Sequence, residues 1–179
     1  MKRPENSRGF TLIEAIVAVI LMGIISGLIA TVIATTIDTL ADVRDRARIV
    51  TSGASAIAFF EREVRMMGAD TALLIADDDQ LRFNDRWGNT IEYTISSGKL
   101  YRQIVGVGSA QVQATPIVTA NCSFLYYKID NLELSSVPLG SSDRQDTRLI
   151  ELRLVLDDGQ SGIPYLVRVF PENLKVVRS

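Results

Sequence analysis

The sequence predicts an α+β fold, in which one long N-terminal helix packs on a mostly antiparallel sheet of about five or six strands. Two observations support this prediction. Residues 10–67 place apolar side chains at helical spacing and contain no proline. Beyond Gly68, apolar and polar residues alternate with a period of two in several short segments. That alternation is typical of half-buried strands.

The start of the predicted helix is long and apolar enough to cross a membrane. Residues 15–37 form an uncharged run of 23 residues. As a helix this run is about 34 Å long, compared with about 30 Å for the hydrocarbon core of a bilayer. Basic residues precede the run and acidic residues follow it. This asymmetry predicts a single-pass protein with its N-terminus in the cytoplasm.

Two ordinary interpretations of this segment compete. A secretory signal peptide has an apolar region of about 7–15 residues, and this run is longer. A passive membrane anchor has the right length but gives no reason for Glu14, the one charged residue in residues 10–37. A carboxylate in such a segment costs about 3 kcal/mol on insertion scales and usually has a partner and a function.

The helix is expected to continue beyond the membrane over residues 38–67. Gly68 is a signal for its end. The predicted organisation is therefore a leader over residues 1–9, a membrane or filament-core helix over 10–37, an amphipathic continuation over 38–67 and a β-rich domain over 68–179. The continuation carries an apolar stripe at Leu40, Val43, Ala47, Val50, Ala54, Ile57, Val64 and Met67.

The β-rich part contains a predicted hairpin, in which Ser97 and Gly98 form a two-residue turn. Residues 106–119 and 130–146 are predicted to be loops. Strands are predicted over residues 81–83, 90–96, 99–105, 123–129, 148–156 and 163–170.

A family resemblance begins at the junction of leader and helix. The run Arg8-Gly9-Phe10-Thr11-Leu12-Ile13-Glu14 resembles the class III signal sequence of type IV pilins and pseudopilins. A short basic leader, a glycine, a phenylalanine and a glutamate directly precede an apolar run, as in that family. The resemblance implies a pilin-like fold, a bacterial inner-membrane location and later incorporation into a periplasmic or extracellular filament.

The resemblance also implies how the chain is processed and assembled. Prepilin peptidase is expected to cut after Gly9, and the new amine of Phe10 is expected to be N-methylated. Glu14 is expected to pair with the Phe10 amine, in this subunit or in a neighbour, and so to fix the register between subunits. The implied partners are other pilins or pseudopilins and the inner-membrane assembly platform.

Gly23 and Gly27 form a small-xxx-small pair, which allows close packing of helices. Glycine is also common in transmembrane helices, and the sequence favours neither explanation over the other.

A second and more diffuse resemblance covers residues 60–68 at the end of the predicted helix. It is similar to PilW-type and J-type minor pilins and pseudopilins, which often carry an Arg-x-x-Gly turn there. Two departures from major pilins favour a minor subunit: the C-terminal cysteine pair is absent, and the strand-rich domain is larger than in a typical major pseudopilin.

The composition excludes the common enzyme classes. The chain has no histidine and one cysteine, so it has neither a His-dependent catalytic triad nor a Cys₄ metal site. We therefore predict no enzymatic activity and no cofactor. The cysteine, Cys122, is expected to be a small buried residue. Trp87 lies in a predicted turn. It is a candidate for an exposed adhesive or partner contact, but packing against the sheet is favoured.

The sequence offers one weak candidate for a metal site, Asp77-Asp78-Asp79. Calcium takes about six to eight oxygen ligands arranged around it, whereas three consecutive aspartates point in different directions. A solvated turn before a strand is therefore favoured, and no metal is predicted.

The functional hypothesis is a minor pilin or pseudopilin that primes or caps a type IV pilus or a type II secretion pseudopilus. The alternative is a filament-tip adhesin or a DNA-uptake pilin with a ligand-binding domain. Residues 69–179 have 11 basic and 14 acidic side chains. Their net negative charge weakens the DNA version, so no nucleic-acid partner is expected.

Overall fold

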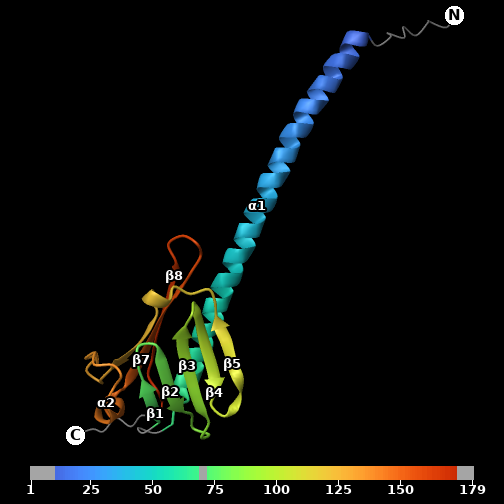
Figure 1. Ribbon diagram of the computed structural model, residues 1–179. Helices are drawn as coiled ribbons and strands as arrows, with labels where there is room; N and C mark the ends of the chain where they lie inside the picture. The colour runs from blue at the N-terminus through green and yellow to red at the C-terminus, as the bar shows by residue number, and fades with distance from the viewer. Residues whose placement is uncertain (1–10, 69–71, 173–179) are drawn as a thin grey trace, which may run out of the picture. The chain divides into compact units, whose positions relative to one another are not determined.

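The computed structural model describes residues 11–68 and 72–172 (Figure 1). The internal contacts of the chain divide it into two units, Met1–Asp45 and Arg46–Ser179. Helix α1, Leu12–Arg65, is 54 residues long, begins in the first unit and ends in the second. The long N-terminal helix predicted from the sequence is therefore confirmed. Its predicted first residue, Phe10, lies outside the described residues.

Within the second unit, the last turns of α1 bury one face. The buried or partly buried positions on this face are Ile49, Gly53, Ala56, Ile57, Phe60, Glu63, Val64 and Met67. The predicted stripe was correct at Ile57, Val64 and Met67. Val50 and Ala54 are exposed, because α1 turns Gly53 and Ala56 toward the strands instead. Small side chains allow the helix backbone to lie close to its neighbours.

The helix ends before the predicted stop at Gly68. Met66 N bonds to the carbonyl oxygen of Glu63 at 3.1 Å, which is the tighter spacing common in a last helical turn. Gly68 N then donates to the carbonyl oxygen of Asn84 at 2.9 Å. The chain has therefore already joined the strands at the position where the sequence suggested a helix cap.

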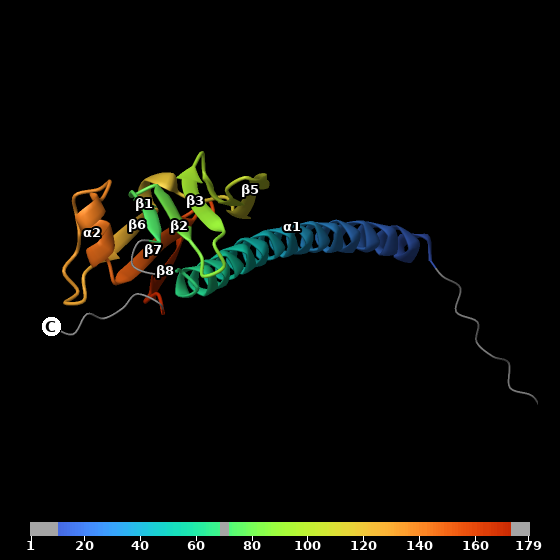
Figure 2. The ribbon, with the colours of Figure 1, turned by 90° about the horizontal axis from the view of Figure 1, so that it is seen from below.

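Five antiparallel strands form the larger sheet, in the order β1-β2-β3-β4-β5 (Figure 1). Figure 2 shows β1, β2, β3 and β5 of this sheet from below. The bounds are Leu73–Ala76, Gln80–Asn84, Thr90–Ser96, Lys99–Ile104 and Val107–Ala114. The predicted hairpin between β3 and β4 is confirmed, with Ser97 at φ 51° and Gly98 at φ 71°. Positive φ at both central residues is the requirement of a type I′ turn.

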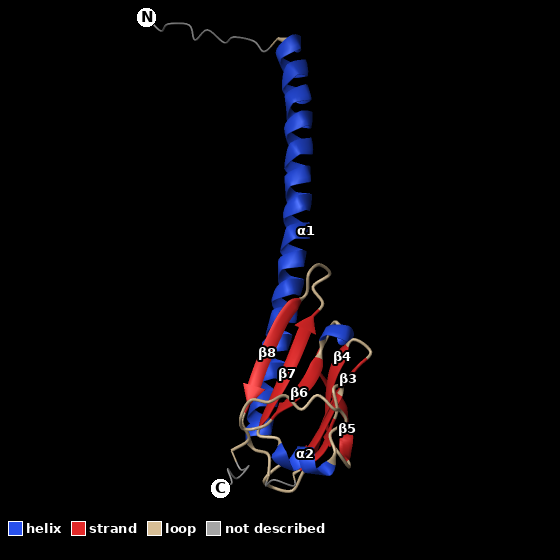
Figure 3. Cartoon of the chain, turned by 90° about the vertical axis from the view of Figure 1, so that its left-hand side faces the viewer, coloured by secondary structure: helices blue, strands red, loops and turns tan. Residues whose placement is uncertain are grey.

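Three further strands form a second antiparallel sheet, β6-β7-β8 (Figure 3). They are Ser123–Tyr127, Leu149–Leu156 and Ile163–Val169. The short helix α2, Ser141–Asp146, and the 3₁₀ turn η1, Thr119–Asn121, lie in the connections. The Tyr165 hydroxyl of β8 donates to the carbonyl oxygen of Val50 at 3.0 Å, which joins this sheet to α1.

The core of the second unit centres on Phe60. Its ring meets Tyr93 of the larger sheet edge to face, with centroids 5.3 Å apart. It stacks on Phe124 of the smaller sheet at 5.9 Å. A single helical side chain thus contacts both sheets, and aromatic pairs of this kind add about 1 kcal/mol beyond the area they bury.

The structure corrects the predicted sheet in three respects. The described residues contain eight strands in two sheets rather than five or six in one. Part of the predicted loop over residues 106–119 is strand β5, and part of that over 130–146 is helix α2. Strand β1 was not predicted at all. The antiparallel α+β class itself is confirmed.

Candidate functional site

Glu14 lies at the start of α1, where it completes a capping box. Thr11 precedes the first helical residue and donates to Glu14 Oε2 from its backbone nitrogen at 3.0 Å and from its hydroxyl at 2.8 Å. Glu14 N lies 3.4 Å from Thr11 Oγ1 and donates back to it. The helix N-terminus thereby gains two of the hydrogen bonds that it lacks internally, and an acidic group beside its positive end.

Sequence reasoning missed this role of Glu14, although the Thr-x-x-Glu spacing was visible. The expected pairing of Glu14 with the Phe10 amine is not tested, because Gly9 and Phe10 lie outside the described residues. One oxygen of Glu14, Oε1, makes no hydrogen bond among the described residues. The capping box therefore leaves that oxygen available to a further donor.

The helix beyond Glu14 presents its apolar side chains outward. By length and composition, α1 is able to cross a membrane. A Cβ atom added at Gly23 or at Gly27 would meet nothing within 4 Å. The proposed packing role of these glycines thus concerns a surface that is open in the isolated chain, and it stays a prediction.

The threonines toward the end of the uncharged run bond to the helix's own backbone. Thr31 Oγ1 donates to the carbonyl oxygen of Gly27 at 3.0 Å, and Thr36 Oγ1 to that of Val32 at 2.7 Å. Thr35 and Thr39 make similar bonds one turn back. In lipid an unpaired polar group is costly, so these bonds make the hydroxyls compatible with an apolar environment.

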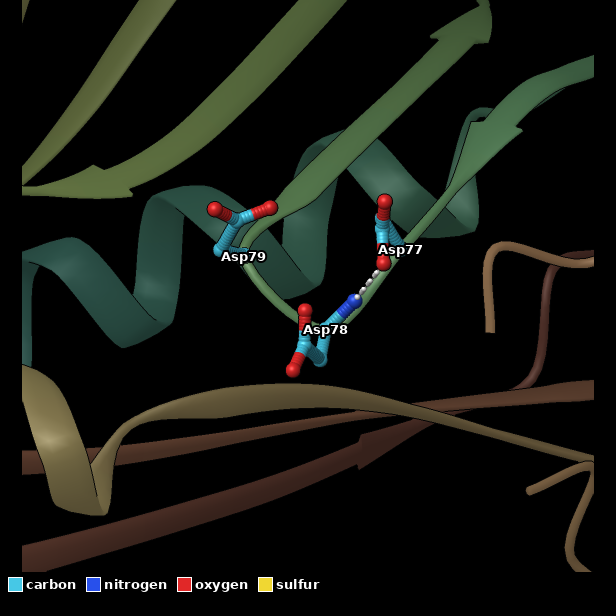
Figure 4. Close-up of side chains that lie close together, drawn as sticks. All are labelled: Asp77, Asp78 and Asp79. Carbon is cyan, nitrogen blue, oxygen red and sulfur yellow. Dashed lines mark hydrogen bonds between the residues drawn. The ribbon is translucent and has the colours of Figure 1, made fainter. Parts of the chain in front are cut away.

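Figure 4 shows the candidate metal ligands, Asp77, Asp78 and Asp79, on the turn between β1 and β2. One oxygen from each carboxylate lies within 4.8 Å of the others, and Asp78 N donates to Asp77 Oδ1 at 2.9 Å. Burial and the charges of the two neighbouring aspartates raise the pKa of Asp78. The three side chains thus form a crowded acidic turn.

The backbone of this turn connects the two sheets. The Tyr126 hydroxyl donates to the carbonyl oxygen of Asp77, and Phe124 N donates to that of Asp78, each at 2.8 Å. Ile95 N donates to the carbonyl oxygen of Asp79, also at 2.8 Å. These hydrogen bonds hold the main chain of the turn in place, and its three carbonyl oxygens already accept hydrogen bonds from the protein.

Three glutamates in the second unit are buried, and each has cationic or hydroxyl partners. Glu63 pairs with Tyr93 and Arg102, Glu92 with Arg82 and Gln103, and Glu151 with Tyr127, Arg153 and Arg168. No buried side-chain nitrogen or oxygen in the described residues lacks a hydrogen-bond partner. Satisfied pairs of this kind stabilise a fold and do not indicate a reactive group.

Residues 5–30 match the family model of the prokaryotic N-terminal methylation motif. No curated protein matched the chain. The matched residues include the apolar first part of α1 and the capping box at Glu14. This motif supports a type IV pilin-like family for the chain.

Proposed function

We propose that the chain is a minor pilin or pseudopilin, a structural subunit that primes or caps a type IV pilus or a type II secretion pseudopilus. The observation that carries this proposal is the methylation-motif match, which falls on a helix able to cross a membrane. The apolar side chains of that helix are exposed in the single chain, as a filament-core segment requires. The PilW-type or J-type assignment rests on the residues around Gly68 and belongs to the proposal.

The proposed pathway begins with cleavage after Gly9 by prepilin peptidase and methylation of the Phe10 amine. The chain then rests in the inner membrane, with its N-terminus in the cytoplasm, until the assembly platform adds it to a filament. The amine of Phe10, in the same or a neighbouring subunit, is the proposed donor to Oε1 of Glu14, which makes no hydrogen bond within the described part of the chain. A charge pair in an apolar environment is expensive to break, so it would fix the axial register of the subunit.

Intact-mass analysis of protein extracted from membranes tests the processing step. Loss of residues 1–9 removes three basic side chains and one acidic one, so the formal side-chain charge moves from −2 to −4. We expect one species that begins at Phe10 and carries one added methyl group. A mature terminus near Thr35 would establish a secretory signal peptide and overturn the proposal.

A further inference from the structure

The outer face of the five-stranded sheet carries a groove of about 310 Å³. The inner face of this sheet packs against α1 through side chains such as Tyr93 and Arg102. Their neighbours along each strand point the other way, because side chains alternate across a strand. Small-molecule sites begin at about 300 Å³, so the groove has room for a small ligand. It is lined from β3, β4 and β5 (Figure 1) by Glu92, Thr94, Ser96, Tyr101, Gln103 and Ala110.

The pairing of β3 with β4 brings the polar side chains of the groove together. Thr94 lies opposite Tyr101, and Glu92 lies opposite Gln103. Thr94 and Tyr101 make no side-chain hydrogen bond to another described residue, and both are partly exposed. Their hydroxyls are therefore open to a donor or an acceptor from outside the chain.

The buried carboxylate of Glu92 fixes the orientation of the Gln103 amide. Gln103 Nε2 donates to Glu92 Oε1 at 3.0 Å, and the Arg82 guanidinium donates to Glu92 Oε2. The amide nitrogen thus faces the carboxylate, and Gln103 Oε1 makes no hydrogen bond within the described part of the chain. An acceptor that is already held in place does not lose the freedom of a mobile side chain when a ligand binds.

The charges and the backbone of the groove disfavour several classes of ligand. An anion would face Glu92, and the nearby cation Arg82 already pairs with that carboxylate. A metal ion would find a single carboxylate, both of whose oxygens already accept hydrogen bonds. An added peptide strand needs a free sheet edge, whereas β3 and β4 are paired on both sides. The groove therefore favours an uncharged ligand that is held by side chains.

We propose that this groove binds a neutral saccharide of one or two sugar rings. Sugar hydroxyls both donate and accept, which matches the hydroxyls of Thr94 and Tyr101 and the carbonyl oxygen of Gln103. The C–H face of a sugar ring is apolar, and the Tyr101 ring offers it a flat surface beside these polar groups. An aromatic ring next to neutral donors and acceptors suits a sugar better than a wholly apolar ligand. The inference concerns the second unit alone and does not depend on the proposed role in a filament.

Sugar binding by the full chain tests the proposal, in a detergent that has no sugar headgroup. The probes are the neutral disaccharides maltose, cellobiose, lactose and chitobiose, with a sulfated disaccharide from heparin as the charged comparison. Ligand-observed NMR titration gives the dissociation constants. We expect at least one neutral disaccharide to bind about ten times more tightly than the sulfated one. Binding of none of the four, or tighter binding of the sulfated disaccharide, would overturn the proposal.

Substitutions then place the sugar in the groove. Tyr101→Ala removes the ring and should weaken binding of the best disaccharide about tenfold, whereas Tyr101→Phe removes only the hydroxyl and should weaken it about threefold. Trp87→Ala is the matched control, because it removes an aromatic ring that is 63% exposed and lies outside the groove. It should leave the dissociation constant unchanged.

Circular dichroism checks that each variant is folded. Thr94→Val keeps the shape of the side chain and loses its hydroxyl, so it replaces Tyr101→Ala if that variant does not fold, with an expected loss of about threefold. Wild-type affinity in Tyr101→Ala, or in Thr94→Val where it is the replacement, would overturn the proposal. Loss of binding in Trp87→Ala would also overturn it, because the sugar would then lie on the turn between β2 and β3.

Discussion

The Tyr93 hydroxyl donates a hydrogen bond of 2.5 Å to Glu63, and this bond connects the last turns of α1 to the middle of the larger sheet. Arg102 completes the cluster, with Nη2 at 2.6 Å and Nε at 3.1 Å from the same carboxylate. Glu63 is only 6% exposed. Its burial is tolerable because both oxygens are paired.

Glu63→Ala should therefore destabilise the second unit substantially. It leaves the partly buried Arg102 guanidinium and the fully buried Tyr93 hydroxyl without an acceptor, and breaking such a pair costs about 3 kcal/mol. The free energy of unfolding, from urea denaturation in detergent, measures the effect. Glu61→Ala is the control, because Glu61 makes an exposed pair with Arg65 that is worth about 0.5 kcal/mol or less. Equal losses in the two variants would contradict the assigned role of Glu63.

Gly53→Ala tests how closely α1 approaches the smaller sheet. An added Cβ atom would lie 2.5 Å from Leu156 Cδ1 and 2.9 Å from Tyr165 Cε2. We expect the free energy of unfolding to fall by about 1–2 kcal/mol. The strain of these close contacts exceeds the roughly 1 kcal/mol by which alanine favours a helix over glycine. Gly23→Ala brings the same gain without a clash, so its melting temperature should not fall. If Gly53→Ala stabilises the protein, the helix has room to move away.

Glu151 should make the protein sensitive to acid. Burial raises the pKa of Glu151, but hydrogen bonds from Arg168 and Arg153 outweigh it, so the pKa lies below its ordinary value of 4.5. A lowered folded-state pKa stabilises the fold above pH 4.5, and this contribution is lost as the pH falls through the folded value.

Glu151→Gln should remove that contribution. At pH 7 we expect the free energy of unfolding to fall by about 1–3 kcal/mol. This is less than the loss for a fully buried ion pair, because both arginines are half exposed. The two unfolding curves should converge as the pH falls below 4.5 and through the lowered pKa of Glu151, as measured by urea denaturation at a series of pH values. Parallel curves over this range would show that the carboxylate is not the titrating group.

Glu14 has an observed role in the capping box and a proposed role in a charge pair, and three substitutions distinguish them. Glutamine also completes a capping box, so Glu14→Gln preserves the helix start and removes only the charge. Thr11→Val does the reverse, since it removes the hydroxyl and keeps the carboxylate. If the charge fixes subunit register, Glu14→Gln and Glu14→Ala should both abolish or strongly reduce filament formation or secretion, and Thr11→Val should support it. Immunoblots of membranes must show that each processed protein is present at normal level.

The opposite pattern would assign Glu14 to the helix start. Assembly with Glu14→Gln at the wild-type level, together with a defect in Thr11→Val, would show that the cap matters and that the charge does not. Our proposal of a charge pair between Glu14 and the Phe10 amine would then be wrong.

The long helix and most strands were predictable because they depend on local patterns. Apolar and polar residues alternate strictly along strand β3. The turn with positive φ is indicated by two adjacent residues, Ser97 and Gly98. Strand β5 was missed because Gly106 and Gly108 resemble loop signals, and its extended form depends on pairing with β4. The division into two sheets was also hidden, since alternation shows which residues face a core but not which strands pair.

The site residues divide in the same way. The methylation motif is a contiguous run, so the sequence alone placed Gly9, Phe10 and Glu14 within it. The partners of Glu63 are 30 and 39 residues away along the chain, and no local pattern connects them. Glu63 is buried and the nearby Glu61 is more exposed, but the two look alike in the sequence. Only contact with the sheet distinguishes them.

Trp87 gives this protein an optical property that its core does not share. The expectation that it packs on the sheet was wrong, because it is 63% exposed, with the guanidinium of Arg86 4.4 Å from its ring. It is the only tryptophan in the chain, and because its ring is exposed we expect its fluorescence in the free subunit to resemble that of an indole in water. Unfolding will change this emission little, whereas a neighbouring molecule that covers the ring will shift it to shorter wavelength. The chain thus contains a built-in reporter of contact at the turn between β2 and β3, and no added dye is required.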